Sequence, residues 1–266
     1  MNRLILSVAL ALAAAVGTIV RVAAVPEIAP PREYPTLDQI LARAATAAAA
    51  YVDATRVIYC EEHYKPVRYR LKQNMEGSFE RVKLDVKPWV AAFAIAASPE
   101  LEALGFDGKS GTEVQDAQAR LGPFGRSVLL PRVVSLFLHA VNQPRFLFEM
   151  GGTRMKKGVT LREVRFETKQ GWTSLESPLG RVTMPASGSF WIDQVTGSVH
   201  SSRLKFADSD SKARFDWMSV TFGADRATGL RLPVSMEHQT GDTWSYETIE
   251  GKAEYTNCRA APRTPR

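Results

Sequence analysis

The segment of this chain best suited to proton transfer or metal binding is Glu61-Glu62-His63. Alternate side chains share a face in an extended strand, so Glu61 and His63 would lie together while Glu62 points to the other face. A carboxylate beside an imidazole can move a proton, and the pair could contribute to a metal site. No second histidine follows at ligand spacing. The pattern therefore favours a solvated strand face, and the sequence predicts no metal.

Two other segments begin like ligand-binding loops. Residues 103–110 (ALGFDGKS) match a relaxed phosphate-loop pattern, but such a loop follows a buried strand, and the preceding SPELEA is not one. We therefore interpret Asp107-Gly108 as a hairpin turn. Residues 208–212 (DSDSK) begin like a calcium loop, yet a lysine takes a ligand position and the distal glutamate is missing. There is no Gly-x-Ser-x-Gly motif, and the sequence predicts neither catalytic residues nor a cofactor.

Basic residues gather in two places. The first is a run of Lys65, Arg68, Arg70 and Lys72, and the second is the group Arg154, Lys156 and Lys157. They could meet phosphate-bearing lipid head groups at a membrane surface, or an acidic partner. The alternative is an ordinary solvated strand face, which the pattern favours. The net charge of +6 over 266 residues is too dispersed for nucleic-acid binding.

The N-terminus has the layout of a secretory signal peptide. Residues 1–3 are basic at their end, residues 4–20 carry no charge, and Val22-Ala23-Ala24 is a small-residue cleavage site. We predict a signal peptide over residues 1–24 and a periplasmic or secreted protein. The alternative is an uncleaved membrane anchor, because about 17 apolar residues lie at the lower limit for crossing a bilayer. In both cases the bulk of the chain is exported.

The two cysteines, Cys60 and Cys258, lie near opposite ends of the chain. In an oxidising compartment we expect a disulfide between them, which would bring the first strand close to the last. It would close a loop of about 198 residues, worth about 4–5 kcal/mol in the chain-entropy account. The alternative is a pair of unpaired buried thiols.

Two helices are expected. Residues 25–35 (VPEIAPPREYP) are proline-rich and predict a linker. A helix should follow over Thr36–Thr55, because Thr36 and Gln39 have capping-box spacing and apolar residues recur at helical intervals. A second helix should cover Pro131–Val141, with proline in its first turn.

From residue 145 onward the apolar period changes to two, which is typical of strands. Short alternating runs are separated by turn residues, so we predict an antiparallel meander. In one of its turns, Asp193 should accept hydrogen bonds from backbone amides and Gly197 should adopt a positive φ.

Earlier in the chain, β-forming residues predict one strand over residues 57–65 and another over 68–73. An antiparallel sheet needs a cover for its apolar face, and the two helices are the available covers. The sequence thus predicts a single domain over residues 36–258, followed by a disordered tail over 259–266.

Several strand motifs resemble a group of uncharacterised exported bacterial proteins. They are GSFWID at 188–193 with TG at 196–197, LRLPV at 230–234, AEYTN at 253–257, NQPRF at 142–146 and EEHY at 61–64. More distantly, the layout resembles the periplasmic lipoprotein-carrier (LolA/LolB-like) superfamily. That resemblance implies an α+β fold with a curved, unclosed antiparallel sheet, a half-barrel with two or three covering helices. It also implies a hydrophobic cavity that can hold acyl chains, and it transfers no catalytic residue.

Eight aromatic side chains are candidates for lining such a cavity: Trp89, Phe93, Phe137, Phe146, Phe148, Phe166, Phe190 and Phe222. Most aromatic residues make core, so they would line a cavity only where they leave space unfilled. The leading hypothesis is an exported, non-enzymatic binding protein that carries or senses a lipid or lipidated ligand at the cell envelope. The first alternative is an envelope scaffold or interaction module with a filled core. The second is a hydrolase that uses the Glu61/His63 face.

Overall fold

The structure is a computed structural model that describes residues 34–55, 58–84, 88–94, 131, 133–169, 175–177, 180–182, 185–207, 214–242 and 247–260. The chain divides into Met1–Tyr34 and Pro35–Arg266, and every element described lies in the second unit. The predicted signal peptide, most of the linker, the Asp107-Gly108 turn and the calcium-like segment lie outside the described residues. Among the residues that the structure describes, no helix is long and apolar enough to cross a membrane.

The long helix α1 (Leu37–Thr55) begins as its sequence predicts. The Thr36 N–H donates to Gln39 Oε1 at 3.0 Å, and the Gln39 N–H donates to Thr36 Oγ1 at 3.3 Å, which completes a capping box. The buried side chains recur at helical spacing and form one stripe: Ile40, Leu41, Ala44, Ala48, Val52 and Thr55. Two of these six residues, Ala44 and Ala48, have small side chains, so the middle of the helix packs little bulk against the core.

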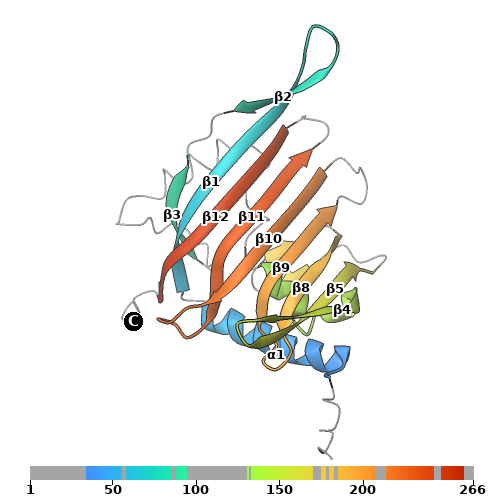
Figure 1. Ribbon diagram of the computed structural model, residues 1–266, viewed down its shortest axis with the longest axis vertical. Helices are drawn as coiled ribbons and strands as arrows, with labels where there is room; N and C mark the ends of the chain where they lie inside the picture. The colour runs from blue at the N-terminus through green and yellow to red at the C-terminus, as the bar shows by residue number, and fades with distance from the viewer. Residues whose placement is uncertain are drawn as a thin grey trace, which may run out of the picture. The chain divides into compact units, whose positions relative to one another are not determined.

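Ten antiparallel strands form the main sheet (Figure 1). They are β1 (Ile58–Gln73), β2 (Phe79–Leu84), β3 (Trp89–Ala94), β4 (Phe146–Lys156), β5 (Val159–Thr168), β8 (Ala186–Asp193), β9 (Val199–Ala207), β10 (Arg214–Ala224), β11 (Arg231–Asp242) and β12 (Glu247–Ala260). Nine follow the order β2-β1-β12-β11-β10-β9-β8-β5-β4, and β3 also pairs with β1. Because β2 and β4 are not paired with each other, the sheet is open. The predicted α+β fold with an unclosed antiparallel half-barrel is confirmed. A separate two-stranded sheet joins β6 (Leu175–Ser177) to β7 (Gly180–Val182).

The first strand is one continuous element, where the sequence predicted two. β1 passes through Pro66, which stands opposite Gly251 of β12. On the other side of β1, β3 pairs with residues up to Tyr64 and β2 pairs from Arg68 onward. Among the described strands, none pairs with β1 on that side at Pro66. A proline, which has no N–H to donate, is tolerated at such a gap.

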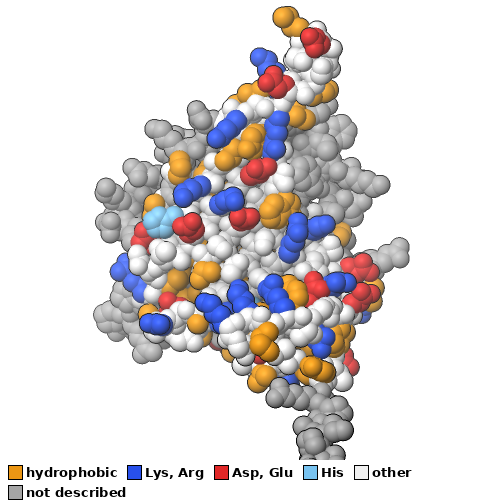
Figure 2. Space-filling model, viewed as in Figure 1, with side chains coloured by type: hydrophobic (Ala, Val, Ile, Leu, Met, Phe, Trp, Pro, Cys, Tyr) orange, Lys and Arg blue, Asp and Glu red, His pale blue; other side chains and the backbone are white. Residues whose placement is uncertain are grey.

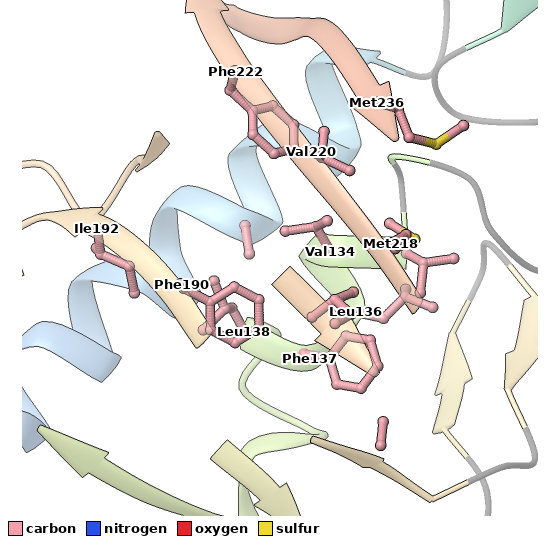
Figure 3. Packing of buried hydrophobic residues seen from close by; sticks show 14 of the residues in the cluster. Val134, Leu136, Phe137, Leu138, Phe190, Ile192, Met218, Val220, Phe222 and Met236 are labelled. Carbon is pink, nitrogen blue, oxygen red and sulfur yellow. The ribbon is translucent and has the colours of Figure 1, made fainter. Parts of the chain in front are cut away.

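A short helix, α4 (Val133–Leu138), is buried along its whole length. A helix that is apolar all round belongs inside a fold. In Figure 3, Val134, Leu136, Phe137 and Leu138 of α4 lie among inward side chains of β8, β10 and β11. These side chains belong to the same core cluster as the buried stripe of α1. The two predicted helices therefore both cover the apolar face of the sheet.

α4 ends earlier than predicted, at Leu138 rather than Val141. The side chain of Asn142 donates to the Leu136 carbonyl at 2.9 Å, and that of Gln143 donates to the Leu138 carbonyl at 2.8 Å. These carbonyls at a helix C-terminus have no partner within the helix, and the two amide side chains satisfy them instead. The chain then makes a 3₁₀ turn over Gln143–Arg145 and enters β4.

The alternating runs place their apolar residues inward, with one informative exception. Leu232 and Met236 of β11 are buried, but Val234 between them is 42% exposed. The register between β10 and β11 shifts here, since Phe222 pairs with Pro233 and Thr221 pairs with Ser235. Val234 is therefore the extra residue of a β-bulge, which turns its side chain away from the core.

The predicted disulfide between Cys60 and Cys258 is confirmed. β1 and β12 are neighbours, and their register shifts between Tyr59 and Glu61. One residue of β1, Cys60, therefore stands opposite two residues of β12, and Asn257 adopts a φ of +50° to form this bulge. β12 continues to Ala260, two residues into the stretch predicted as a tail.

Replacing both cysteines with alanine should lower the free energy of unfolding by about 2–5 kcal/mol, because the bridge restricts the unfolded chain. Urea unfolding followed by tryptophan fluorescence measures this difference. Wild-type protein treated with a thiol reductant serves as the matched control and should unfold like the double variant. Unchanged stability after reduction would show that the cross-link contributes nothing to the fold.

Candidate functional site

A cavity of about 340 Å³ lies between α1, α4 and two turns of the sheet. Its wall on the α1 side consists mostly of alanines, among them Ala44, Ala47 and Ala48. Val134 and Leu138 of α4 contribute aliphatic side chains. Small side chains on a packed helix leave space that leucine or phenylalanine would fill. The alanine-rich sequence of α1 therefore produces the cavity.

The turn between β8 and β9 forms a second part of the wall, through residues 196–199. As predicted, Asp193 Oδ1 accepts the N–H of Val195 at 2.8 Å, and Gly197 adopts a φ of +76°. A side chain at Gly197 would also collide with the backbone of Arg43 in α1. Arg43 donates a hydrogen bond to the Gln194 carbonyl. The glycine thus allows the turn to lie directly on the helix, which closes this side of the cavity.

Besides Ser135, Thr196 and Ser198, two larger polar side chains interrupt the apolar wall. Tyr51 of α1 and Arg231 of β11 both line the cavity, and both contact Phe222 of β10. The Tyr51 ring meets the Phe222 ring edge-on with centroids 6.3 Å apart, and Arg231 Nη2 donates to the Phe222 carbonyl at 2.8 Å. Tyr51 Oη and Arg231 Nε are buried and have no hydrogen-bond partner among the described residues. Burial raises the pKa of Tyr51, so its hydroxyl keeps its proton, and burial lowers the pKa of Arg231.

His200 lies close to this part of the wall. Trp191 pairs with Ser201 and Ile192 pairs with Val199, so His200 occupies the register shift between β8 and β9. Burial, with a further contribution from the charge of Arg231, lowers the pKa of His200 from 6.5 to about 4. The imidazole is therefore neutral at pH 7.

A second buried polar group lies on the inner face of the sheet, away from the cavity wall. Tyr64 Oη and His238 Nε2 are 2.6 Å apart, and the two rings stack with centroids separated by 5.7 Å. A side chain at Gly251 would collide with both. Glu62, also on this face of β1, is 1% exposed. No local sequence pattern indicates this pairing, because Tyr64 and His238 are 174 residues apart.

Glu61 and His63 share a face of β1, as predicted. His63 Nε2 lies 2.8 Å from Glu61 Oε1, and the Asn257 side chain donates to Glu61 Oε2 at 2.8 Å. The His63 side chain is 39% exposed, and the pair does not line the cavity. Within the described part of the chain, no group of three His, Cys, Asp or Glu residues could hold a metal ion.

The first basic run is largely an ion-pair network. Arg68 and Arg70 both donate to Glu247 of β12, with Nε–carboxylate distances of 3.1 and 2.8 Å. Burial opposes ionisation of Glu247, but the hydrogen bonds from the two arginines outweigh it, so its pKa is lowered. Lys65 and Lys72 are exposed. In Figure 2 basic and acidic side chains are interspersed on this face, which is the pattern of a solvated surface.

The aromatic candidates separate into two groups. Phe222 lines the cavity, whereas Phe137, Phe146, Phe166 and Phe190 are buried and pack against one another. Ring centroids are 4.9 Å apart for both Phe137–Phe166 and Phe166–Phe190. Phe148 lies half-buried at the edge of this cluster, 5.9 Å from Phe146. The side chains of Trp89 and Phe93 lie outside those described. The sequence analysis did not identify the alanines of α1, Tyr51 or Arg231 as cavity residues. The run of small side chains in α1 was the signal that could have indicated unfilled space.

Neither a family model nor a curated protein matches the chain. Several solved structures are similar over most of its length, among them the following three. A DUF1329 family protein from Desulfovibrio piger is 12% identical, covering 86% of this chain and 94% of its own, with a TM-score of 0.36. A LolA superfamily protein from Nitrosomonas europaea is 8% identical, with coverages of 83% and 94% and a TM-score of 0.30. A chain of the Pseudomonas aeruginosa MucA/MucB complex is 10% identical, covering 82% of this chain and 99% of its own, with a TM-score of 0.22.

The Nitrosomonas europaea protein belongs to the superfamily that the layout of this chain resembles.

The depressed pKa of His200 generates a prediction about acid stability. The folded protein takes up a proton at His200 only near pH 4, whereas the unfolded chain does so near 6.5. The stability that the neutral histidine contributes is therefore complete above about pH 6.5 and is lost as the pH falls towards 4, by at most about 3 kcal/mol.

Urea unfolding at pH 7, 5.5 and 4 should show that His200→Gln loses less stability on acidification than the wild type. Ala42→Gln, at an exposed residue of α1 that carries no titratable group, is the control and should retain the wild-type pH dependence. Identical pH profiles for wild type and His200→Gln would contradict the assignment.

Proposed function

We propose that this protein is an exported binding protein that holds a hydrophobic ligand in the cavity between α1, α4 and the two turns. The observation that carries the proposal is an apolar space of about 340 Å³ beside a well-packed aromatic core. This volume lies in the range of small-molecule sites, which are mostly apolar with a few placed polar groups. A fold that packs four phenylalanines in contact could also have filled this space, and alanines stand there instead.

The disulfide supports the exported part of the proposal. Bridges such as Cys60–Cys258 form and persist in oxidising compartments outside the cytoplasm. The predicted signal peptide over residues 1–24 agrees with that location. The cell envelope is also where a carrier or sensor of lipids or lipidated proteins would work.

The mechanism follows from the composition of the wall. Hydrocarbon entering the cavity leaves water and gains contacts with the alanines of α1 and with Val134 and Leu138, which is favourable in proportion to the apolar area removed from water. In this mechanism the six-residue helix α4 is the part of the wall that moves. Gln143 fastens its end by donating to the carbonyls of both Leu41 and Leu138, at 3.0 and 2.8 Å. Release of these two bonds would widen the entrance.

One observation favours a second candidate, a protein-interaction module. β4 ends the path of the main sheet, and along it Leu147, Met150 and Met155 are 50%, 37% and 75% exposed. No other described strand pairs with its outer edge. An extended segment of another protein could add to such an edge. This interaction would be independent of the cavity, so a cavity-filling variant would leave it unchanged.

Filling the cavity should abolish ligand binding without unfolding the protein. Ala47 lines the cavity from a half-buried position on α1, so Ala47→Leu would place extra methyl groups in the space at little cost to the core. We expect the affinity for the fluorescent probe N-phenyl-1-naphthylamine to fall about tenfold or more, equal to about 1.4 kcal/mol of binding free energy.

Ala42→Leu is the matched control, because Ala42 is an exposed residue of the same helix and does not line the cavity. It should bind the probe like the wild type. Equal binding by both variants, or no binding by the wild type, would overturn the proposed function.

A further inference from the structure

We propose that the occupant of the cavity is a single-chain amphiphile, a hydrocarbon chain ending in a carboxylate, and that Arg231 and Tyr51 bind its head group. The inference rests on the proposed function and specifies its ligand. It comes from the polar atoms of the wall, which a purely hydrophobic ligand would leave without partners.

The first step concerns hydrogen bonding. Tyr51 Oη and Arg231 Nε are buried in the wall, and no described residue satisfies either. A buried donor without a partner is destabilising, and more so when it is charged. An oxygen-bearing head group in the cavity would accept from both donors and remove this cost. A hydrocarbon alone would leave the cost in place, because it offers neither atom an acceptor.

The second step concerns position, because both donors belong to residues that contact Phe222. The Tyr51 ring contacts the Phe222 ring, and the Arg231 guanidinium donates to the Phe222 carbonyl. One guanidinium nitrogen is engaged by the Phe222 carbonyl, so the rest of its donor fork stays available. The aliphatic wall made by α1 and α4 lies in the same cavity. The site thus has a polar end and an apolar remainder, as an amphiphile requires.

The third step concerns charge. No acidic side chain in the described part of the chain forms an ion pair with Arg231. The charge of nearby Asp193 favours the ionised form of Arg231, while Asp193 Oδ1 accepts the amides of Val195 and Thr196 in its own turn at 2.8 and 3.3 Å. Arg154 and Lys156 add further positive charge to this region, as their influence on neighbouring His200 shows. An arginine in such surroundings favours an anion, and its planar fork matches a carboxylate.

The fourth step concerns size. A volume of about 340 Å³ is near the lower end of the range for small-molecule sites. It suits one chain of moderate length. A lipid with two or three acyl chains would need considerably more space, so the ligand carries a single chain.

The test compares laurate with dodecanol, which has the same chain length and an uncharged head group. Competition with the naphthylamine probe on the purified protein measures both affinities. We expect laurate to bind about tenfold or more tightly than dodecanol, since its carboxylate can form charge-assisted hydrogen bonds with Arg231. Arg231→Gln should reduce this preference to about twofold or less, while Tyr51→Phe should weaken laurate binding only a few-fold.

Arg226→Gln is the matched control. Arg226 is an exposed arginine of the turn that connects β10 to β11, five residues before Arg231, and it does not line the cavity. It should keep the wild-type preference. Arg231→Lys, which retains the charge without the fork, should keep part of it and also guards against misfolding of the glutamine variant.

The outcomes separate the two proposals. Equal binding of laurate and dodecanol by the wild type would overturn the head-group assignment and leave the proposed function standing. Binding of neither, together with no binding of the probe, would overturn the proposed function itself. Tight stoichiometric uptake of a two-chain lipid such as dioleoyl phosphatidylglycerol would overturn the single-chain assignment.

Discussion

The apolar inner face of an open antiparallel sheet must be covered. In this structure the size of the side chains on the covering helices determines where the core is filled and where a cavity remains. Here the cover is a long helix with an alanine-rich stripe and a six-residue helix that is wholly buried. Where the cover carries large side chains, as at Phe137, the core is solid. Where it carries alanines, a cavity remains. Core and site are therefore two parts of one packing arrangement, distinguished by side-chain size along the same layer.

Among the residues that the structure describes, three carboxylates that are at least half-buried have their charge compensated by neighbours. Glu247 lies between two arginines, Glu61 is held by His63 and Asn257, and Asp193 is bound by the amides of its turn. Buried charges are normally paired in this way, because an unpaired one is costly. Arg231 forms no ion pair with any described residue, and it lines a cavity in which a small molecule could complete its environment. The contrast makes this arginine more informative than the more numerous basic residues on the outer strands, which the sequence analysis singled out.

Features that depend on neighbours in the sequence could be predicted, and features that depend on strand register could not. The capping box at Thr36 and the turn at Gly197 are local, and both formed as expected. The bulge that exposes Val234 and the gap that accommodates Pro66 arise from how two strands align, which no local pattern specifies. The cavity shows the same limit. Large aromatic residues were the natural candidates for its lining, but bulky side chains consume volume, and the space was left by alanines whose significance depends on what faces them.

The position of the last strand has a consequence for how the sheet is assembled. β12 lies between β1 and β11, so the two parts of the sheet meet only through the final strand. Until that strand is added, β1 lacks its neighbour on this side and Cys60 lacks its disulfide partner. The meander from β4 to β11 can pair without it, whereas the union of β1 with that meander needs almost the whole chain. Formation of the cross-link therefore marks the joining of the two parts.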